Sequence, residues 1–385
     1  MEKLKRFQEK YPEEFKVKSP VLPKSSFSRF SLNDRKELSK IYFNLAEAII
    51  RENDTMTEMT EENKLRALNY FNSSINSDFR HNKGIYSRIA KLYAANENQI
   101  GAYINALIAV ELGKMSRNDE FFVEQCKKMP FQTPKGIIRI NDKMIESIGV
   151  FFLFPIDLVL ILEPGTYTID FPIGVKKNVV IIGICEVTIK GQLLGVDCNF
   201  ILYNVSVEYV KEERINHSLL FKTSNVFISN CQFTKCSQSY APICISGRKA
   251  SLVMNECLVA NSEDGILVDT DSKAYIENCK IQNIGASAIE VRYGSTLIAV
   301  KNHIHNNKNG VIVYLDANEV TLTDNIIQEN HAEGIIIKGN REPPLSREIN
   351  AEYYRSCKKV SYIPPPTTPY KNQHRPLLKC RRIRS

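Results

Sequence analysis

The 385-residue sequence has no tryptophan, and it lacks the short motifs by which many enzymes and metal sites are identified. It contains no C-x-x-C pair, which argues against a structural zinc site. It also contains no Walker A or G-x-G-x-x-G loop and no G-x-S-x-G or H-E-x-x-H motif. The sequence therefore predicts no catalytic residue, no cofactor and no metal ligand.

Long apolar segments are also missing. The amino terminus, MEKLKRFQEKYPEEF, is charged and has no hydrophobic core of the kind that export signals carry. The most apolar run, residues 150–162, is short and contains Pro155 and Asp157, so it cannot cross a bilayer. These features predict a cytoplasmic protein that does not bind membranes and whose ten cysteines are reduced.

The net charge of +8 is confined to one end of the chain. Residues 341–385 hold 11 Lys and Arg against 3 Asp and Glu, so the remainder is neutral. A neutral body with a basic tail does not indicate a dedicated nucleic-acid-binding domain. We expect a flexible segment at residues 1–30 and, at 343–385, a short capping helix followed by a disordered tail. Within that tail, the Pro364–Pro369 segment predicts polyproline II and a contact for SH3- or WW-type domains.

The second half of the chain is repetitive. Each unit has two apolar residues in alternation, a Cys or Asn three positions later, a polar bend, and a second alternating pair. The fixed Cys/Asn position recurs after 26, 22, 23 and 23 residues, a period typical of solenoids. The residues at this fixed position are Cys231, Cys257, Cys279, Asn302 and Asn325. Two degenerate copies of the unit come earlier in the chain and begin at Val180 and Phe200.

The alternation identifies the type of solenoid. These units follow a period of two rather than 3.6, and they show no leucine-rich-repeat pattern, so they predict strands. Short strands joined by bends rich in Asn, Gly, Asp and Ser predict a parallel β-helix over residues 136–342, with about eight coils. The Cys/Asn column falls at a bend, where amides can bond to the next coil. The expected inward column of the closing strands is Ile245, Val268, Val291, Val313 and Ile337.

Residues 31–127 have a helical pattern, which makes the fold class α+β with separate domains. A capping box at Ser31 begins a helix to about Glu52. Further helices are expected at residues 61–75, 82–95 and 97–112. The last two resemble a tetratricopeptide repeat, with Ile89, Ala90, Tyr93, Ala102, Ala106 and Ala109 at its packing positions. A generic four-helix cap on the end of the β-helix is the alternative.

The repeats, together with the opening segment Glu163-Pro164-Gly165-Thr166-Tyr167-Thr168-Ile169, resemble right-handed parallel β-helix proteins. The repeats most resemble those of intracellular animal proteins, namely the Shc SH2-domain-binding-protein-like proteins and the β-helix of some F-box proteins. This resemblance covers a little over half of the chain. It implies an adaptor role in signalling, cytoskeletal or cell-division complexes. The same fold also serves carbohydrate enzymes, so the resemblance is specific for fold and weak for function.

Alternation also assigns the outward residues of the closing strands. Asp269, Glu290 and Arg292 fall on neighbouring coils, and a cross-strand ion network is the main interpretation. A partner contact and a catalytic role are the alternatives. Catalysis is disfavoured, because a glycosidase needs two carboxylates spaced across the bond and a calcium site needs several oxygen ligands.

Apolar residues stand beside these charges at Leu267, Ile312 and Tyr314, and Lys338 lies next to them. A contiguous apolar column on an outer face indicates a contact surface, covered either by a partner protein or by the chain itself.

The histidines His303, His305 and His331 are interpreted as solvated bend residues rather than as a metal cluster. The sequence as a whole predicts a non-enzymatic scaffold that binds protein partners. A polysaccharide lyase or glycoside hydrolase is the alternative.

Overall fold

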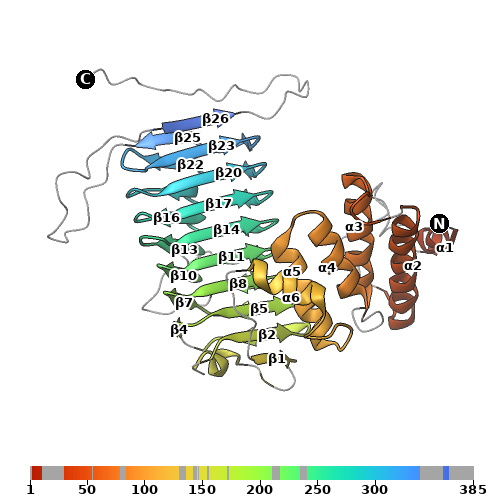
Figure 1. The fold of residues 1–385 in the computed structure, drawn as a ribbon. Coiled ribbons are helices and arrows are strands. Elements are labelled where there is room, and N and C mark those ends of the chain that lie inside the picture. Colours follow the sequence, from red (N-terminus) through yellow and green to blue (C-terminus); the bar gives the residue numbers. More distant parts are fainter. Residues whose placement is uncertain are drawn as a thin grey trace. The chain divides into compact units, whose positions relative to one another are not determined.

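The structure is a computed structural model, and it divides into two compact units, Met1–Arg139 and Ile140–Ser385 (Figure 1). Each unit is described by itself. The residues that the structure describes are 2–10, 30–53, 55–78, 84–129, 136–141, 145, 147–153, 156–170, 173–209, 217–234, 241–338 and 359–363.

The first unit is helical. Ser31 caps the second helix by accepting a hydrogen bond from the Asp34 backbone N–H, and Thr60 and Asn98 cap two later helices in the same way. The predicted helices are therefore confirmed, with ends shifted by a few residues. The helices are α1 (Glu2–Lys10), α2 (Leu32–Arg51), α3 (Glu61–Ser77), α4 (Ile85–Ala95), α5 (Gln99–Glu111) and α6 (Glu120–Lys128).

These helices pack in pairs. Between α2 and α3, the hydroxyls of Ser39 and Ser74 lie 2.9 Å apart in a buried contact, and the rings of Tyr42 and Tyr70 stack. Between α4 and α5, Gly101 lies directly against the Tyr93 ring, where a Cβ atom would come within 2.7 Å. Small residues thus permit close contact between paired helices. The tetratricopeptide assignment itself stays a prediction.

The second unit is a stack of coils, each built from three short strands (Figure 1). The opening strands form a sheet of β1 (Gly136–Ile140), β2 (Leu158–Leu162), β5 (Val179–Gly183), β8 (Asn199–Tyr203), β11 (Asn225–Ser229), β14 (Ser251–Asn255), β17 (Lys273–Glu277), β20 (Thr296–Val300), β23 (Glu319–Thr323) and β26 (Lys359–Ile363). The middle strands form a sheet of β3 (Gly165–Thr168), β6 (Val187–Lys190), β9 (Ser206–Glu208), β12 (Gln232–Phe233), β15 (Leu258–Ala260), β18 (Lys280–Gln282), β21 (His303–His305) and β24 (Ile326–Gln328). The closing strands form a sheet of β4 (Ile173–Val175), β7 (Leu193–Val196), β10 (Leu219–Lys222), β13 (Ile243–Ser246), β16 (Ile266–Asp269), β19 (Ser287–Val291), β22 (Asn309–Tyr314) and β25 (Glu333–Lys338). A 3-10 helix, η2 (Gly149–Leu153), precedes β2.

The register of the closing strands confirms the predicted inward column. Ile245 pairs with Val268, Val268 with Val291, and Val291 with Val313. All four are at most 1% exposed, because each side chain packs between its counterparts in the neighbouring coils. Ile337 continues the same column but is 40% exposed, since β25 is the last closing strand among the described residues.

The degenerate copy at Val180 has a different register from the one the sequence predicts. The structure pairs Val179, not Val180, with Phe200, whose side chain is fully buried. Val180 and Ile182 therefore lie on the outer face of the sheet, yet both are at most 3% exposed. All five residues of β5 are buried, so alternation carries no signal there, and the predicted register is off by one residue.

The corner between opening and middle strands has a repeated construction. A residue in the left-handed region makes each bend, and the Cys or Asn that follows is buried. The left-handed residues are Asn230, Glu256, Asn278, Lys301 and Asp324, with φ between 51° and 55°. Within the column, the Cys279 N–H donates to Asn302 Oδ1 (2.8 Å), and Asn302 Nδ2 donates to Asn325 Oδ1 (2.9 Å). This confirms that the amides bond from coil to coil.

The thiols of the same column are free and buried at Cys231, Cys257 and Cys279. Burial raises the pKa of the Cys257 thiol well above its usual range, because the thiolate would lose its hydration. A protonated thiol is a poor nucleophile, so Cys257 is a packing residue rather than a reactive one.

Replacing Asn302 with aspartate is expected to lower the free energy of unfolding by about 2–3 kcal/mol. Asn302 is 1% exposed, and its Nδ2 donates to the Ile276 carbonyl oxygen at 2.8 Å. In Asn302→Asp, a carboxylate oxygen would replace this amide nitrogen and face the Ile276 carbonyl oxygen and Asn325 Oδ1. It has no hydrogen to donate to either oxygen. Urea denaturation measures the loss.

The control for that substitution is Asn302→Cys, because cysteine occupies the same position at Cys279. We expect it to cost only about 1 kcal/mol, since a small neutral side chain leaves no buried charge. Equal stability of the two variants would contradict the importance of the amide ladder.

Two predictions at the chain ends need correction. Glu2–Lys10 form α1, where the sequence predicts a flexible segment; Leu4 is 1% exposed and Lys10 Nζ lies 2.8 Å from Asp34 Oδ1. In the predicted disordered tail, Lys359–Ile363 form β26 and pair in parallel with β23. The predicted capping helix after residue 343 and the Pro364–Pro369 segment lie outside the described residues.

Candidate functional site

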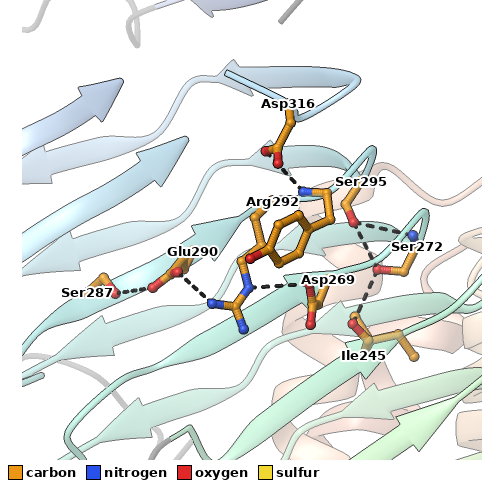
Figure 2. Close-up of polar contacts among 9 residues, drawn as sticks. Ile245, Asp269, Ser272, Ser287, Glu290, Arg292, Ser295 and Asp316 are labelled. Atoms are coloured by element: carbon orange, nitrogen blue, oxygen red, sulfur yellow. Dashed lines mark hydrogen bonds and ion pairs between the residues drawn. The ribbon is translucent and has the colours of Figure 1, made fainter. Parts of the chain in front are cut away.

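The charged residues predicted on the closing strands do come together (Figure 2). Arg292, directly after β19, donates from Nε to Asp269 Oδ1 at 3.2 Å and from Nη1 to Glu290 Oε1 at 3.3 Å. The exposed fractions of the three side chains are 12% for Arg292, 18% for Asp269 and 8% for Glu290. The predicted ion network is therefore confirmed, and it is more deeply buried than outward alternation indicates.

A serine connects this network to a further acid. Ser287, at the start of β19, shares its hydroxyl hydrogen between Asp264 Oδ1 at 2.7 Å and Glu290 Oε2 at 3.3 Å. Figure 2 shows the contact with Glu290. The Ser287 backbone N–H also donates to Asp264 Oδ1 at 3.2 Å. Both Glu290 oxygens are thus hydrogen-bonded. Sequence reasoning missed Asp264 because it lies in a bend, outside the alternating pattern.

His217, just before β10, lies near the same charges. Its Nδ1 donates to the Ala241 carbonyl oxygen at 2.8 Å, which fixes the tautomer because a carbonyl can only accept. Burial lowers the pKa of His217, and the positive charge of Arg292 acts in the same direction. The carboxylates of Asp269 and Asp264 oppose the shift. The neutral imidazole is therefore the favoured form in this surrounding.

The apolar residues of the predicted contact surface are not exposed. Leu267, Ile312 and Tyr314 are only 4%, 3% and 2% exposed. Leu267 packs in a small outer cluster with Cys244, Ala241 and Leu220. Ala241 belongs to the segment that enters β13, so the chain itself covers this part of the face. Of the two alternatives predicted for this column, cover by the chain itself is the outcome at Leu267.

The polar members of the predicted surface are more accessible. Lys338 is exposed, and its Nζ lies 5.9 Å from the centroid of the Tyr314 ring, within the range of a cation–π contact. Asp269 and Arg292 are half-buried. A partner contact at these three residues stays a prediction.

A second outer column was missed by the sequence analysis. On the opening strands, Phe227 pairs with Val253, Val253 with Tyr275, and Tyr275 with Ile298. The first three are half-buried and Ile298 is 39% exposed. The available signal was an apolar residue at the middle position of four consecutive opening strands, where a solvated face would be polar. We call Phe227, Val253, Tyr275 and Ile298 the opening-strand column.

The histidines differ from the solvated residues that the sequence predicts. His303 and His305 both point outward from β21, and their rings stack with centroids 4.2 Å apart. His305 is only 9% exposed, so the prediction is wrong for it, whereas His331 is exposed as expected. Burial lowers the pKa of both His303 and His305, and nearby Lys280 lowers them further.

Within the described ranges, no three or more His, Cys, Asp or Glu side chains are grouped so that they could hold a metal ion. Among the helices that the structure describes, none combines the length and apolar character needed to cross a bilayer.

Comparison with known proteins bears on the fold. Residues 198–348, which is less than half of the chain, match the family model described as right handed beta helix region. The match and the parallel register of the three sheets together define a right-handed parallel β-helix repeat protein. No curated protein matches the chain, and no solved structure matches it either.

Proposed function

We propose that this protein is a non-enzymatic scaffold that binds protein partners through the outer surface of its β-helix. The observation that carries the proposal is the opening-strand column, in which apolar side chains of four successive coils stand in register on an outer face. At about 4.8 Å per coil the column is about 14 Å long. Aromatic and aliphatic side chains grouped in this way are typical of protein interfaces.

The surroundings of the column fit a protein partner. Tyr275 donates its hydroxyl hydrogen to Glu277 Oε2 at 3.2 Å, and Lys273 begins the same strand. Polar and charged groups thus border the apolar centre, which is the usual arrangement of a specific contact. The resemblance to Shc SH2-domain-binding-protein-like and F-box β-helix proteins supports an adaptor role. The helical unit, the basic tail and the cytoplasmic location belong to this proposal as further expectations.

The arrangement of the acids favours a scaffold over a carbohydrate enzyme. Asp269 and Glu290 are both held by Arg292, and Glu290 also accepts a hydrogen bond from Ser287. A glycosidase needs one carboxyl group to give a proton and another to face the sugar. An arginine bonded to both acids offsets one of their two negative charges and holds both carboxylates in place.

The test compares two isoleucine-to-aspartate variants by proximity labelling in the native cell. Ile298→Asp changes the opening-strand column, and Ile326→Asp is the matched control, because Ile326 is similarly exposed (44%) but lies on the middle strand β24. Partners that depend on the column should be lost with Ile298→Asp and kept with Ile326→Asp. For a purified partner we expect Kd to rise at least tenfold, equivalent to about 1.4 kcal/mol.

Two outcomes would contradict the proposal. One is an unchanged set of labelled proteins in Ile298→Asp. The other is the appearance of new reducing or unsaturated ends when the wild-type protein is incubated with acidic or neutral polysaccharides, with and without calcium. If that activity is lost in both Asp269→Asn and Glu290→Gln, the enzyme alternative is correct.

A further inference from the structure

The paired histidines of β21 have features that packing alone does not explain. His303 and His305 are two positions apart on one strand, so both imidazoles lie on the same outer face. Their centroids are 4.2 Å apart with an angle of 29° between the ring planes. The Nε2 atom of His305 is buried and has no hydrogen-bond partner. A buried ring nitrogen without a partner loses its hydration and gains nothing in return.

The other nitrogen of His305 is already held. The Asn306 side chain forms a hydrogen bond with the His305 ring, and because Nε2 has no partner, this bond involves Nδ1. A histidine that ligates a metal ion usually has its second nitrogen fixed in this way, which sets the tautomer and the ring orientation. The lone pair of His305 Nε2 is thereby left for a ligand.

Oxygen donors stand next to the two rings. Gln328 pairs with His305 across the strands, and its side-chain amide lies 3.4 Å from His303 Nε2. Rotation of this amide would present its oxygen to the same space. Glu329 accepts the Asn306 backbone N–H through its carbonyl at 3.2 Å, so it borders the site on the next coil.

We propose that His303 and His305 form a surface site for a divalent transition-metal ion, bound through the two imidazole nitrogens. Neutral imidazole favours Zn²⁺, Ni²⁺ and Cu²⁺, whereas Ca²⁺ and Mg²⁺ prefer oxygen ligands. Rotation about the second side-chain torsion of histidine is broad, so the His303 ring can turn its Nε2 atom toward an ion held at His305 Nε2 while the His305 ring keeps its orientation. The Gln328 side-chain amide and water complete the ligand set.

The nearby ammonium group of Lys280 provides a further test of the proposed metal site. Lys280 pairs with His303 in register, so its ammonium group stands beside the site and repels a divalent ion. Replacing it with glutamine should therefore strengthen binding. A merely structural role of the histidine pair would not produce that effect, since the lysine contributes no ligand.

The experiment titrates Zn²⁺ and Ni²⁺ into the 385-residue chain without a polyhistidine tag, by calorimetry. Neither ion is reduced by thiols under these conditions, so the ten cysteines are not oxidised by the probe. We expect one site per chain, weakened at least tenfold in both His303→Ala and His305→Ala and unchanged in His331→Ala. His331 is the matched control because it is an exposed histidine in the following bend.

Circular dichroism melting of each variant shows whether the fold is kept. Tighter binding in Lys280→Gln supports the site further. The proposal is overturned if the wild-type protein takes up neither ion, or if His303→Ala and His305→Ala bind as tightly as wild type. It is also overturned if His331→Ala removes binding to the same extent.

Discussion

Val291→Asp is expected to unfold the β-helix. Val291 is fully buried and packs between Val268 and Val313 in the inward column, so a carboxylate there would lie between two apolar side chains. Valine and aspartate have similar volumes, so the change introduces charge with little change in size. An unpaired buried carboxylate must be protonated or exposed, at a cost of several kcal/mol. That is a large share of the 5–15 kcal/mol by which domains are stable.

The matched control for this variant is Ile298→Asp. Ile298 lies on the neighbouring strand β20 and is 39% exposed, so its carboxylate would remain in water. Circular dichroism and urea denaturation should show a cooperative transition for Ile298→Asp and none for Val291→Asp. A soluble Val291→Asp variant that melts cooperatively would falsify the register of the closing strands.

Removal of Arg292 is expected to cost about 3–5 kcal/mol of unfolding free energy. In Arg292→Met, Glu290 and Asp269 keep their charges but lose the guanidinium that pairs with both. Because Arg292 points outward from the sheet, the sequence alone would predict only a small change in the unfolding free energy. The 12% exposure of the Arg292 side chain changes that expectation, because the acids cannot regain full hydration.

Two further variants separate this effect from a general loss of packing. The triple variant Arg292→Met, Glu290→Gln, Asp269→Asn removes all three charges and should recover most of the stability. Arg248→Met breaks the ion pair with Asp271, in which the Arg248 side chain is 79% exposed, and should cost under about 1 kcal/mol. Chemical denaturation monitored by circular dichroism measures all of these. Equal losses in Arg292→Met and Arg248→Met would show that burial of the network is unimportant.

The sequence predicts this fold well wherever one face of each strand is apolar and the other polar. The inward position of Val291 and the meeting of Asp269, Arg292 and Glu290 both follow from a period of two and a repeat of 22 or 23 residues. At Val180 the same reasoning fails by one residue, because β5 is buried on both faces and either register buries apolar side chains.

The site was predicted less completely, for a different physical reason. Alternation tells which way a side chain points, but not what the chain places over it. Leu267 points outward and is nevertheless buried, since Ala241 comes from outside the strand pattern to pack against it. The opening-strand column is apolar in the sequence, at Phe227, Val253, Tyr275 and Ile298, but alternation does not distinguish an accessible outer residue from a covered one.

The parallel register has a consequence for the kinetics of folding. Nearly every pairing joins residues only 20 to 26 positions apart in the chain, such as Ile276 with Ala299 in the opening strands. Closing a loop of that length costs much less entropy than the distant pairings of a β-sandwich. Contacts between near neighbours in sequence are associated with faster folding. Any two adjacent coils can form first, and the remaining coils then add one at a time in both directions.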